Sequence, residues 1–362
     1  MKERKEYISA LKINDGIKQP PSINPAVLNG PAGRKRKRYS ENEYVEAILA
    51  GNRTILSQAI TLVESSLPDH YELAQVIIEK CLPYSSESIR IGITGVPGAG
   101  KSTFIETFGL HITGEGRKLA VLTIDPSSEH TGGSILGDKT RMEKLSIHPS
   151  AFIRPSPSAG SLGGVARKTR ETIILCEAAG FNTIIVETVG VGQSETAVDS
   201  MVDFFLLLML AGAGDELQGI KRGIMEMADL IAITKADGPN RLIAEGARVS
   251  YQNALHLFTS RTPGWKPQVL TCSALENKGI RELWDLILTY FIVTKKSGHF
   301  DEFRKKQAVV RMDSMIIDFL NNAFYKQEEV IMLRPEVEKL LYDGKITSYK
   351  AAVKLLDKYF KR

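Results

Sequence analysis

The stretch "GVPGAGKST", from Gly95 to Thr103, has residue types and spacing suited to holding phosphate. It matches G-x-x-x-x-G-K-[ST] and follows an apolar run, as a strand–loop–helix phosphate cradle requires. Its glycines let backbone N–H groups turn toward phosphate oxygens. We expect Lys101 to reach the β- and γ-phosphates and Ser102 to ligate Mg²⁺, with the following helix N-terminus attracting the anion. The predicted nucleotide-binding residues of this loop are Gly95, Val96, Pro97, Gly98, Ala99, Gly100, Lys101, Ser102 and Thr103.

Two later segments indicate which base is bound. "TKAD", ending at Asp237, overlaps the end of the apolar run 230–234, and "TCSAL", ending at Leu275, overlaps the end of the run 267–272. The Asp237 carboxylate can accept from the N1–H and N2–H of guanine, a pair that adenine does not offer. Lys235 can lay its stem along the base. The sequence therefore favours GTP over ATP. The predicted base contacts are Thr234, Lys235, Asp237, Ser273, Ala274 and Leu275.

Carboxylates near the ends of other apolar runs suit a magnesium site. Asp125 ends the run 119–125, and Glu187 begins "ETVG", which has the acidic-x-x-Gly spacing of an element that meets Mg²⁺ and the γ-phosphate. Asp138 lies in the polar stretch "GGSILGDKTRM", where a surface acid is the plain alternative. Mg²⁺ prefers oxygen ligands and keeps several waters. Asp125 could instead orient the attacking water. The predicted metal ligands are Ser102, Asp125, Asp138 and Glu187.

The segment "DFFLLLMLAGAGDELQGIKRGI", residues 203–224, joins a buried apolar run to a charged loop spaced by glycines. The pattern alone is compatible with a plain turn. If the run is a strand of a parallel sheet, however, the loop lies beside the nucleotide edge and its glycines can act as hinges. The candidate groups that could then take two positions are Asp215, Glu216, Gln218 and Lys221.

Short apolar runs separated by helical stretches must position these groups. The runs are 89–94, 119–125, 182–188, 203–210, 230–234 and 267–272. Continuous apolar strands that alternate with helices predict a mostly parallel sheet covered on both faces. Loops at the carboxyl ends of such strands carry the function. The predicted fold class is therefore α/β, a P-loop GTPase domain with helical segments before and after it.

Four regions follow from the patterning. We expect a basic flexible arm at 1–40, a helical segment at 41–88, the P-loop domain at 89–297 and a C-terminal helical region at 298–362. The second region begins with the capping-box pair of Ser40 and Glu43. In the last region, 300–324 reads as one long amphipathic helix, and 334–360 as two shorter helices broken at Gly344.

Charge and composition exclude several classes. Residues 1–40 hold ten Lys/Arg against three Asp/Glu, whereas the remaining chain holds 37 against 39. The basic arm, without interleaved aromatics, favours a solvated tether over a nucleic-acid patch or a localisation signal. No apolar run is long enough for a membrane span. The widely spaced Cys81, Cys176 and Cys272 suit a reducing compartment, and no signal peptide is visible, so we expect a cytoplasmic protein without membrane or nucleic-acid partners.

The motifs "GVPGAGKST", "IDPSSEHTGGSILGDKTRM", "ETVGVGQSE", "AGAGDELQGIKRGI" and "TKAD" together resemble the MeaB/MMAA (ArgK-type) family. These are SIMIBI-class P-loop GTPases that chaperone adenosylcobalamin-dependent methylmalonyl-CoA mutase. The resemblance covers about residues 40–360. It implies GTP/GDP and Mg²⁺ as ligands, the mutase as partner, and a homodimer through the C-terminal helices.

The resemblance also implies roles for residues in the switch regions. Asp125 and Asp138 belong to the metal and first-switch region, Glu187 to the second switch, and "GDELQGIK" to a third switch that reports nucleotide state to the mutase. We expect Lys221, or a residue supplied by the partner, to complete the site in the complex and so accelerate a slow intrinsic reaction. The candidate catalytic residues are Lys101, Asp125, Gln218 and Lys221.

Three other functions remain open at this stage. A nickel metallochaperone of the same class would need Cys or His ligands, but His130 is isolated and no C-x-x-C motif exists. A kinase acting on a transport component would need an acceptor-activating base, and no HRD-like loop is present. A GTP-binding module without turnover would show no phosphate release.

Overall fold

The computed structural model describes residues 39–65, 67–85, 87–125, 142–157, 162–188, 194–211 and 222–360. Its contacts divide the chain into Met1–Ser40 and Glu41–Arg362, and the description below concerns the second unit. Nearly all of the predicted basic arm lies outside the described residues.

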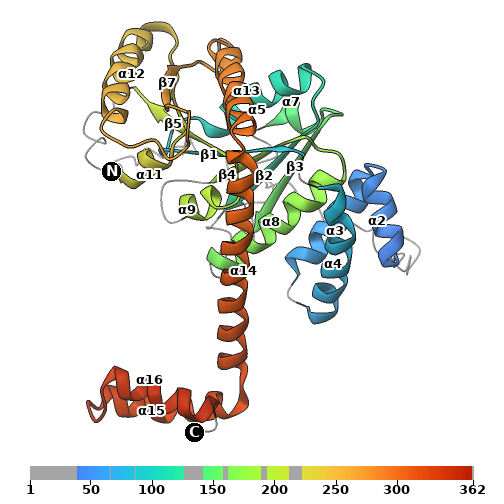
Figure 1. The fold of residues 1–362 in the computed structure, drawn as a ribbon, viewed down its shortest axis with the longest axis vertical. Helices are drawn as coiled ribbons and strands as arrows, with labels where there is room; N and C mark the ends of the chain where they lie inside the picture. The colour runs from blue at the N-terminus through green and yellow to red at the C-terminus, as the bar shows by residue number, and fades with distance from the viewer. Residues whose placement is uncertain are drawn as a thin grey trace, which may run out of the picture. The chain divides into compact units, whose positions relative to one another are not determined.

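A seven-stranded parallel sheet forms the centre of this unit (Figure 1). Its strands are β1 Ile89–Gly95, β2 Leu119–Asp125, β3 Ala151–Pro157, β4 Thr183–Thr188, β5 Phe204–Leu210, β6 Leu230–Thr234 and β7 Gln268–Thr271. They are ordered β3-β2-β4-β1-β5-β6-β7, and every neighbouring pair is parallel. The carboxyl ends of all seven strands therefore lie at one edge of the sheet. This confirms the predicted fold class and all six predicted strands.

Strand β3 was not predicted, because "AFIRPSP" contains two prolines. Its position at the edge of the sheet explains why they are tolerated. The N–H of Leu119 donates to the carbonyl of Ser150, and Leu119 lies opposite Ala151 in the register. The even-numbered residues of β3 therefore turn their backbone groups toward β2. Pro155 and Pro157 fall at odd positions on the free edge, where no ladder N–H is needed.

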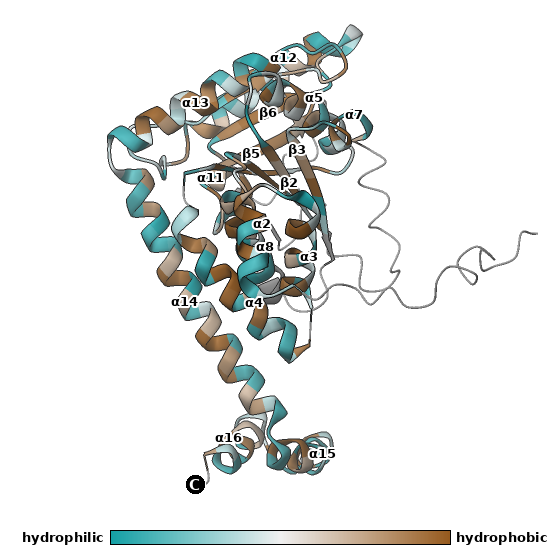
Figure 2. Ribbon diagram, turned by 90° about the vertical axis from the view of Figure 1, so that its right-hand side faces the viewer, coloured by the Kyte–Doolittle hydropathy of each residue, from teal (hydrophilic) through white to brown (hydrophobic). Residues whose placement is uncertain are grey.

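Helices cover both faces of the sheet, with α5, α7 and α13 on one face and α8 and α9 on the other (Figure 1). Their bounds, together with those of the helices near β5–β7, are α5 Lys101–Gly114, α7 Glu143–Ser146, α8 Leu162–Ala178, α9 Ser194–Asp199, α11 Arg222–Met227, η3 Gly238–Asn240, α12 Arg241–Leu255 and α13 Ile280–Lys296. Phe108 of α5 meets Trp284 of α13 edge-on, with ring centroids 5.8 Å apart, and both side chains are fully buried. Hydrophobic residues concentrate between the layers (Figure 2). The Phe108–Trp284 contact thus joins α5 and α13 in the core on their face of the sheet.

Three helices precede the sheet and pack on α8. They are α2 Glu41–Leu49, α3 Arg53–Glu64 and α4 Pro68–Cys81, followed by the short η1 Leu82–Tyr84. Between α2 and α3, Gly51 has a φ of +75°. The side chain of Asn52 then caps α3 by accepting from the N–H groups of Thr54 and Ile55. The helical pattern is thus interrupted at Gly51 and Asn52.

The C-terminal region is helical, as predicted. Its elements are α14 His299–Lys326, α15 Glu328–Tyr342 and α16 Ser348–Tyr359. The break at Gly344 is confirmed, because this residue lies between α15 and α16 with a φ of +68°. Helix α15 begins earlier than the predicted segment 334–360, and Pro335 lies inside it.

Two buried ion pairs lie at the amino edge of the sheet, and one of them holds α14 there. Arg304 of α14 donates from Nε and Nη2 to the two oxygens of Asp203, at 2.8 and 2.7 Å, and from Nη2 to the carbonyl of Ser88. Arg90 of β1 donates to both oxygens of Glu177 in α8, at 2.8 and 3.0 Å. Both carboxylates are almost fully buried. Because an unpaired charge at such a site is costly, the Arg304–Asp203 pair fixes the start of α14 beside β5, and the Arg90–Glu177 pair fixes α8 against β1.

Candidate nucleotide-binding site

The predicted phosphate loop connects the end of β1 to the start of α5. A Cβ on Gly95 would lie 2.5 Å from the carbonyl oxygen of Leu208 in the adjacent strand, so only glycine fits there. Gly98 and Gly100 have φ values of +79° and +78°, in the region that favours glycine. The three positions thus require glycine for two reasons, a close approach at Gly95 and a left-handed backbone at the other two. The loop therefore folds as its spacing predicts.

Lys101 begins α5 and folds its side chain back over the loop. Its Nζ donates to the carbonyl of Gly95 at 3.0 Å. Burial lowers the pKa of Lys101, while the nearby carboxylates of Glu187 and Glu195 act in the opposite direction. The ammonium group is thus partly withdrawn from water and faces two acids. An anion such as a phosphate would supply the missing compensation.

The N-terminus of α5 is open to a ligand. Gly100 is the N-cap, and no side chain caps the helix, so its first-turn N–H groups are not claimed in that way. Ser102 and Thr103 lie in this turn and are at least partly exposed. A helix of this length presents positive dipole character to an anion at this end. The arrangement can therefore cradle phosphate.

Strand β6 ends directly against the phosphate loop. The hydroxyl of Thr234 donates to the carbonyl of Ala99 at 2.8 Å and also reaches the carbonyl of Met209 at 3.1 Å. The next residue, Lys235, has a φ of +55°, which is unusual for a residue with a side chain. Its Cε lies 3.7 Å from the position of a Cβ built on Gly100. The Lys235 stem therefore lies along the loop.

Asp237 is positioned from the neighbouring strand. The hydroxyl of Ser273, just after β7, donates to Asp237 Oδ2 at 2.7 Å. The N–H of Ala236 donates to the carbonyl of Cys272 at 3.0 Å. Sequence reasoning named Ser273 only as a contact to the base, so the orienting role of its hydroxyl was missed. The available signal was an aspartate shortly after β6 and a serine shortly after β7.

The segment after β7 is also tied to α5. The hydroxyl of Thr107 donates to the carbonyl of Ala274 at 3.2 Å, which holds the segment against the helix that begins with the phosphate loop. Leu275 is 81% exposed. The structure thus brings the predicted phosphate and base segments together at one edge of the sheet.

The predicted magnesium site is only partly described. Glu187 is buried in β4, and its influence on Lys101 places it beside the phosphate loop. Asp125 ends β2 at the same edge, as predicted, but its side chain lies outside the described residues, as does Asp138. Oxygen donors on Ser102 and Glu187 fit the preference of Mg²⁺. Within the described ranges, no three His, Cys, Asp or Glu side chains form a metal-binding group.

The predicted third switch lies outside the described residues. Its groups are Asp215, Glu216, Gln218 and Lys221. Strand β5, which leads into this segment, is described and ends at Leu210. Glu195 of α9 is an additional candidate that sequence reasoning missed, since it is 2% exposed and acts electrostatically on Lys101. Its signal was an acid close behind "ETVG".

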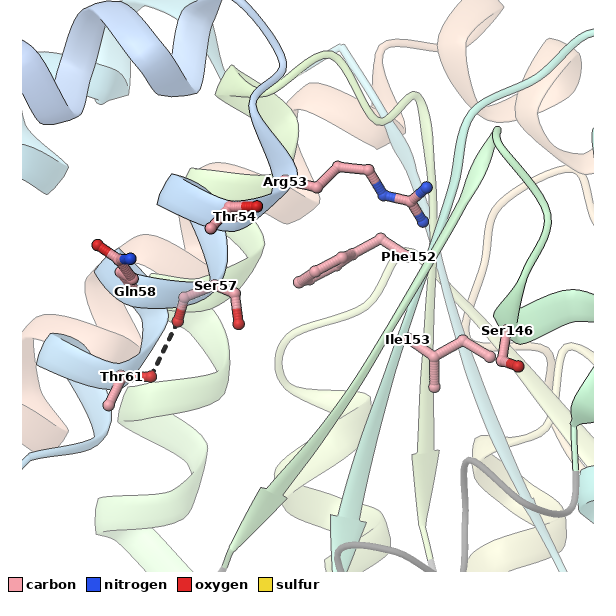
Figure 3. Close-up of a pocket in the computed structure, with 8 residues that line it drawn as sticks. All are labelled: Arg53, Thr54, Ser57, Gln58, Thr61, Ser146, Phe152 and Ile153. Atoms are coloured by element: carbon pink, nitrogen blue, oxygen red, sulfur yellow. Dashed lines mark hydrogen bonds between the residues drawn. The ribbon is translucent and has the colours of Figure 1, made fainter. Parts of the chain in front are cut away.

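A separate polar cavity of about 520 Å³ lies between α3 and β3 (Figure 3). The hydroxyl of Thr61 donates to the carbonyl of Ser57 at 2.9 Å, and Arg154 donates to the hydroxyls of both residues. The lining also includes Arg53 and Phe152. The hydroxyls of Ser57 and Thr61 are thus already engaged within the protein, and the cavity lining contains none of the predicted phosphate-binding residues.

The fold and this edge of the sheet define a P-loop nucleotide-binding protein of the GTPase class. Residues 56–329 match the family described as "Methylmalonyl Co-A mutase-associated GTPase MeaB". The chain belongs to this family. The resemblance seen in the motifs is confirmed.

Similar proteins come from distant organisms. The chain is 48% identical to the GTPase ArgK of Escherichia coli, over 79% of this chain and 87% of that protein. It is 41% identical to the mitochondrial methylmalonic aciduria type A homolog of Mus musculus, over 97% and 87%. A solved structure described as "LAO/AO transport system kinase" matches with a TM-score of 0.72 and 37% identity, over 89% of this chain and 98% of that one.

None of the described helices has the length and apolar content needed to cross a bilayer.

Proposed function

We propose that this protein is a Mg²⁺-dependent GTPase that gates adenosylcobalamin loading onto methylmalonyl-CoA mutase and protects the loaded enzyme. The supporting observation is the joint placement of Lys101 and Asp237 at one sheet edge, in a chain of the MeaB family. Lys101 suits the phosphates and Asp237 suits guanine. The mutase partnership rests on the family and on the relative whose printed name refers to methylmalonic aciduria.

The phosphate end of the site would work by charge neutralisation. Lys101 would exchange its bond to the Gly95 carbonyl for the β- and γ-phosphates, and the N–H groups of the loop would hold their oxygens. Mg²⁺, when bound, supplies further neutralisation of the same oxygens. The residues that would hold it are Ser102, Asp125, Asp138 and Glu187. Asp125 can also orient the attacking water.

The base end would select guanine by its hydrogen-bonding edge. The Ser273 hydroxyl holds one oxygen of Asp237, and the carboxylate can accept from guanine N1–H and N2–H. Lys235 would cover the base with its stem, and the segment Ser273, Ala274 and Leu275 would donate a backbone N–H to O6. An adenine base would leave the other oxygen of Asp237 without a donor, at a cost of about 1–3 kcal/mol.

The switch segments would convert nucleotide state into partner affinity. Glu187 belongs to the second switch, and Asp215, Glu216, Gln218 and Lys221 to the third. Gln218 and Lys221, or a residue supplied by the mutase, would complete the catalytic site only in the complex. GTP can bias the mutase only as far as the GTP- and GDP-bound proteins differ in affinity for it.

The C-terminal helices would form a homodimer. An apolar cavity of about 540 Å³ lies among α14, α15 and α16, lined in part by Phe324, Leu341 and Leu355. Further apolar side chains on α14 are exposed, as on Ile317 and Phe319. Faces of this kind are typical of interfaces between copies of a chain. We place the protein in the cytoplasm, consistent with three buried cysteines that are free thiols.

GTP hydrolysis by the full chain, with and without an adenosylcobalamin-dependent methylmalonyl-CoA mutase, tests the proposal. We expect slow turnover alone and clear stimulation by the mutase, lost in Lys221→Ala if Lys221 completes the site. Different mutase affinities are expected for the GTP-analogue and GDP forms. Equal affinities would rule out gating. Recovery of the labelled γ-phosphate on an acceptor protein, instead of as free phosphate, would favour a kinase.

A further inference from the structure

Three arginines gather where α8 packs against α14, on the face of the sheet that carries α9. Arg167 and Arg170 come from α8, and Arg311 comes from α14, one turn beyond Gln307 on the face that contacts the domain. Gln307 donates to the carbonyl of Val202 at 2.8 Å, which fixes this face against the start of β5. All three guanidinium groups are half-buried. They belong to no part of the nucleotide site.

The cluster has fewer acids than cations. In the described part of the chain, none of these arginines forms an ion pair. Arg167 stacks over the ring of Tyr71 at 4.9 Å, and Arg170 donates to the hydroxyl and carbonyl of Ser200. The nearby carboxyl is that of Glu171, which is 1% exposed and accepts from Gln75.

The energetics of this arrangement are unfavourable in the isolated chain. Burial lowers the pKa of Arg311, and the like charges of Arg90 and Arg167 lower it further, against the opposing effect of Glu171. Burial likewise raises the pKa of Glu171, against the opposing charges of Arg167 and Arg311. Mutual repulsion of half-buried cations destabilises a fold. A local cost of this kind is expected at a binding site whose compensating charge is supplied by a ligand.

We propose that Arg167, Arg170 and Arg311 form a docking surface for an acidic segment of the partner enzyme. The inference rests on the proposed function for the identity of that partner, the mutase. The planar fork of arginine matches a carboxylate with two hydrogen bonds, and arginine is enriched at the centres of interfaces. The charge of the chain favours a protein partner over nucleic acid. Beyond residue 40 the chain carries 37 basic and 39 acidic residues, so it lacks the broad positive field that nucleic acid requires.

The surface is connected to the nucleotide site through α9. Arg170 holds Ser200, which directly follows α9, and the same helix carries the buried Glu195 that acts on Lys101. Carboxylates that bind Arg170 would compete with Ser200 and so act on the position of α9. Docking and nucleotide binding would then be coupled, with each ligand changing the affinity of the other by the same factor.

Arg311→Met tests the proposal, because it removes the charge while keeping much of the volume. The measurement is the affinity of the full chain for the mutase with a non-hydrolysable GTP analogue, at low and moderate salt. We expect binding to weaken about tenfold or more and to depend less on salt. The thermal midpoint should be equal to or higher than that of the wild type, since repulsion is relieved. The matched control is Lys306→Met, on the exposed face of the same helix, where Lys306 pairs with Glu302.

If Arg311→Met binds the mutase as tightly as Lys306→Met does, the docking surface is overturned and the proposed function is unaffected. Absence of mutase binding by the wild type would overturn both. If Arg311→Met does not fold, Arg167→Glu is used for the same measurement. Its reversed charge must weaken binding to the mutase more than tenfold if the proposal holds. RNA binding that is lost in Arg311→Met, with mutase binding unchanged, would also overturn the proposal.

Discussion

The hydroxyl of Ser273 donates to Asp237 Oδ2 across 2.7 Å, joining the loops that follow β7 and β6. This bond leaves the other oxygen of Asp237 available and fixes the plane of the carboxylate. The two residues are 36 positions apart in the chain, and the parallel pairing of β6 with β7 brings them together. The guanine recognition that we propose for Asp237 would therefore depend on the register of these two strands.

Asp237→Asn is predicted to change the preferred base. An amide presents a donor where the carboxylate presents an acceptor, so it should reject the N2–H of guanine and donate to the O2 of xanthine. We expect GTP affinity to fall about 100-fold and xanthosine triphosphate to bind more tightly than GTP. Competition binding with fluorescent nucleotides measures both values. Ser273→Ala is the control, which should lower GTP affinity only several-fold without changing the preferred base. An unchanged base preference in Asp237→Asn would contradict the assignment of Asp237 to guanine recognition.

Lys101→Met is predicted to separate nucleotide binding from stability. Burial holds the pKa of Lys101 below its usual range, so the folded state disfavours the charged form. The unfolded chain therefore binds the proton of Lys101 more tightly than the folded chain does. The charged ammonium group lowers the stability of the fold, and this cost disappears as the pH rises through the folded pKa. Without nucleotide, Lys101→Met should therefore melt no lower than the wild type, whereas GTP affinity should fall at least about 100-fold. A variant that melts well below the wild type would show that Lys101 stabilises the empty loop.

Gly95→Ala is predicted to damage the loop by steric conflict. The new Cβ would lie 2.5 Å from the carbonyl oxygen and 2.8 Å from the Cβ of Leu208, and neither strand can move easily. We expect a loss of about 2–3 kcal/mol in the free energy of unfolding, with loss of GTP binding. Gly246→Ala is the control, because a Cβ there meets nothing within 4 Å inside α12 and should stabilise by about 0.5–1 kcal/mol. Urea denaturation of both variants gives the comparison.

The sequence was sufficient for the fold wherever strands are buried on both faces. Every residue of β4 is buried, and such strands appear as continuous apolar runs. Strand β3 lies at the edge, where prolines are tolerated, so its composition pointed away from a strand. The long helix α14 was predictable because its amphipathic pattern extends over several turns.

The candidate site was predictable only where a motif is local. The phosphate loop lies within nine consecutive residues, and "TKAD" within four. The contact of Ser273 with Asp237 depends on strand pairing, and the closeness of Glu195 to Lys101 depends on how α9 packs against β1 and β4. No local pattern carries such information. The assignments for Asp138 and Lys221 remain predictions, because these residues lie outside the described part of the chain.

The ion pair between Glu177 and Arg90 predicts a specific pH dependence of stability. Burial would raise the pKa of Glu177, but the charge and hydrogen bonds of Arg90 outweigh it, so the pKa lies below its ordinary value. The stabilisation is therefore present above the ordinary carboxyl pKa and is lost as pH falls through the folded value. Glu177→Gln should lose about 2–4 kcal/mol at pH 7 and show a flatter decline toward pH 4.

Urea denaturation at a series of pH values checks this dependence. Glu282→Gln, on the exposed surface of α13, should leave both the stability and its pH dependence unchanged. Parallel acid limbs for the wild type and Glu177→Gln would show that other carboxyl groups control acid unfolding.

The exposed apolar face of α14 predicts a dimer that a single charge can break. Beyond Arg311, the helix exposes Ile317 and Phe319, each to 57%, and Leu320 to 59%. Isolated monomers rarely leave a contiguous apolar patch of this kind in water. Ile317→Glu places a charge within that patch, where burial against a second copy would require its desolvation, so we expect the dimer to dissociate at micromolar concentration. Light scattering after size exclusion should show the mass falling to about half.

Leu242→Glu is the matched control, because Leu242 is 85% exposed as a separate site on α12 and its replacement should leave the mass unchanged. If both variants keep the mass of the wild type, the patch is not the dimer interface; if the wild type is already monomeric, its apolar face must meet a different partner.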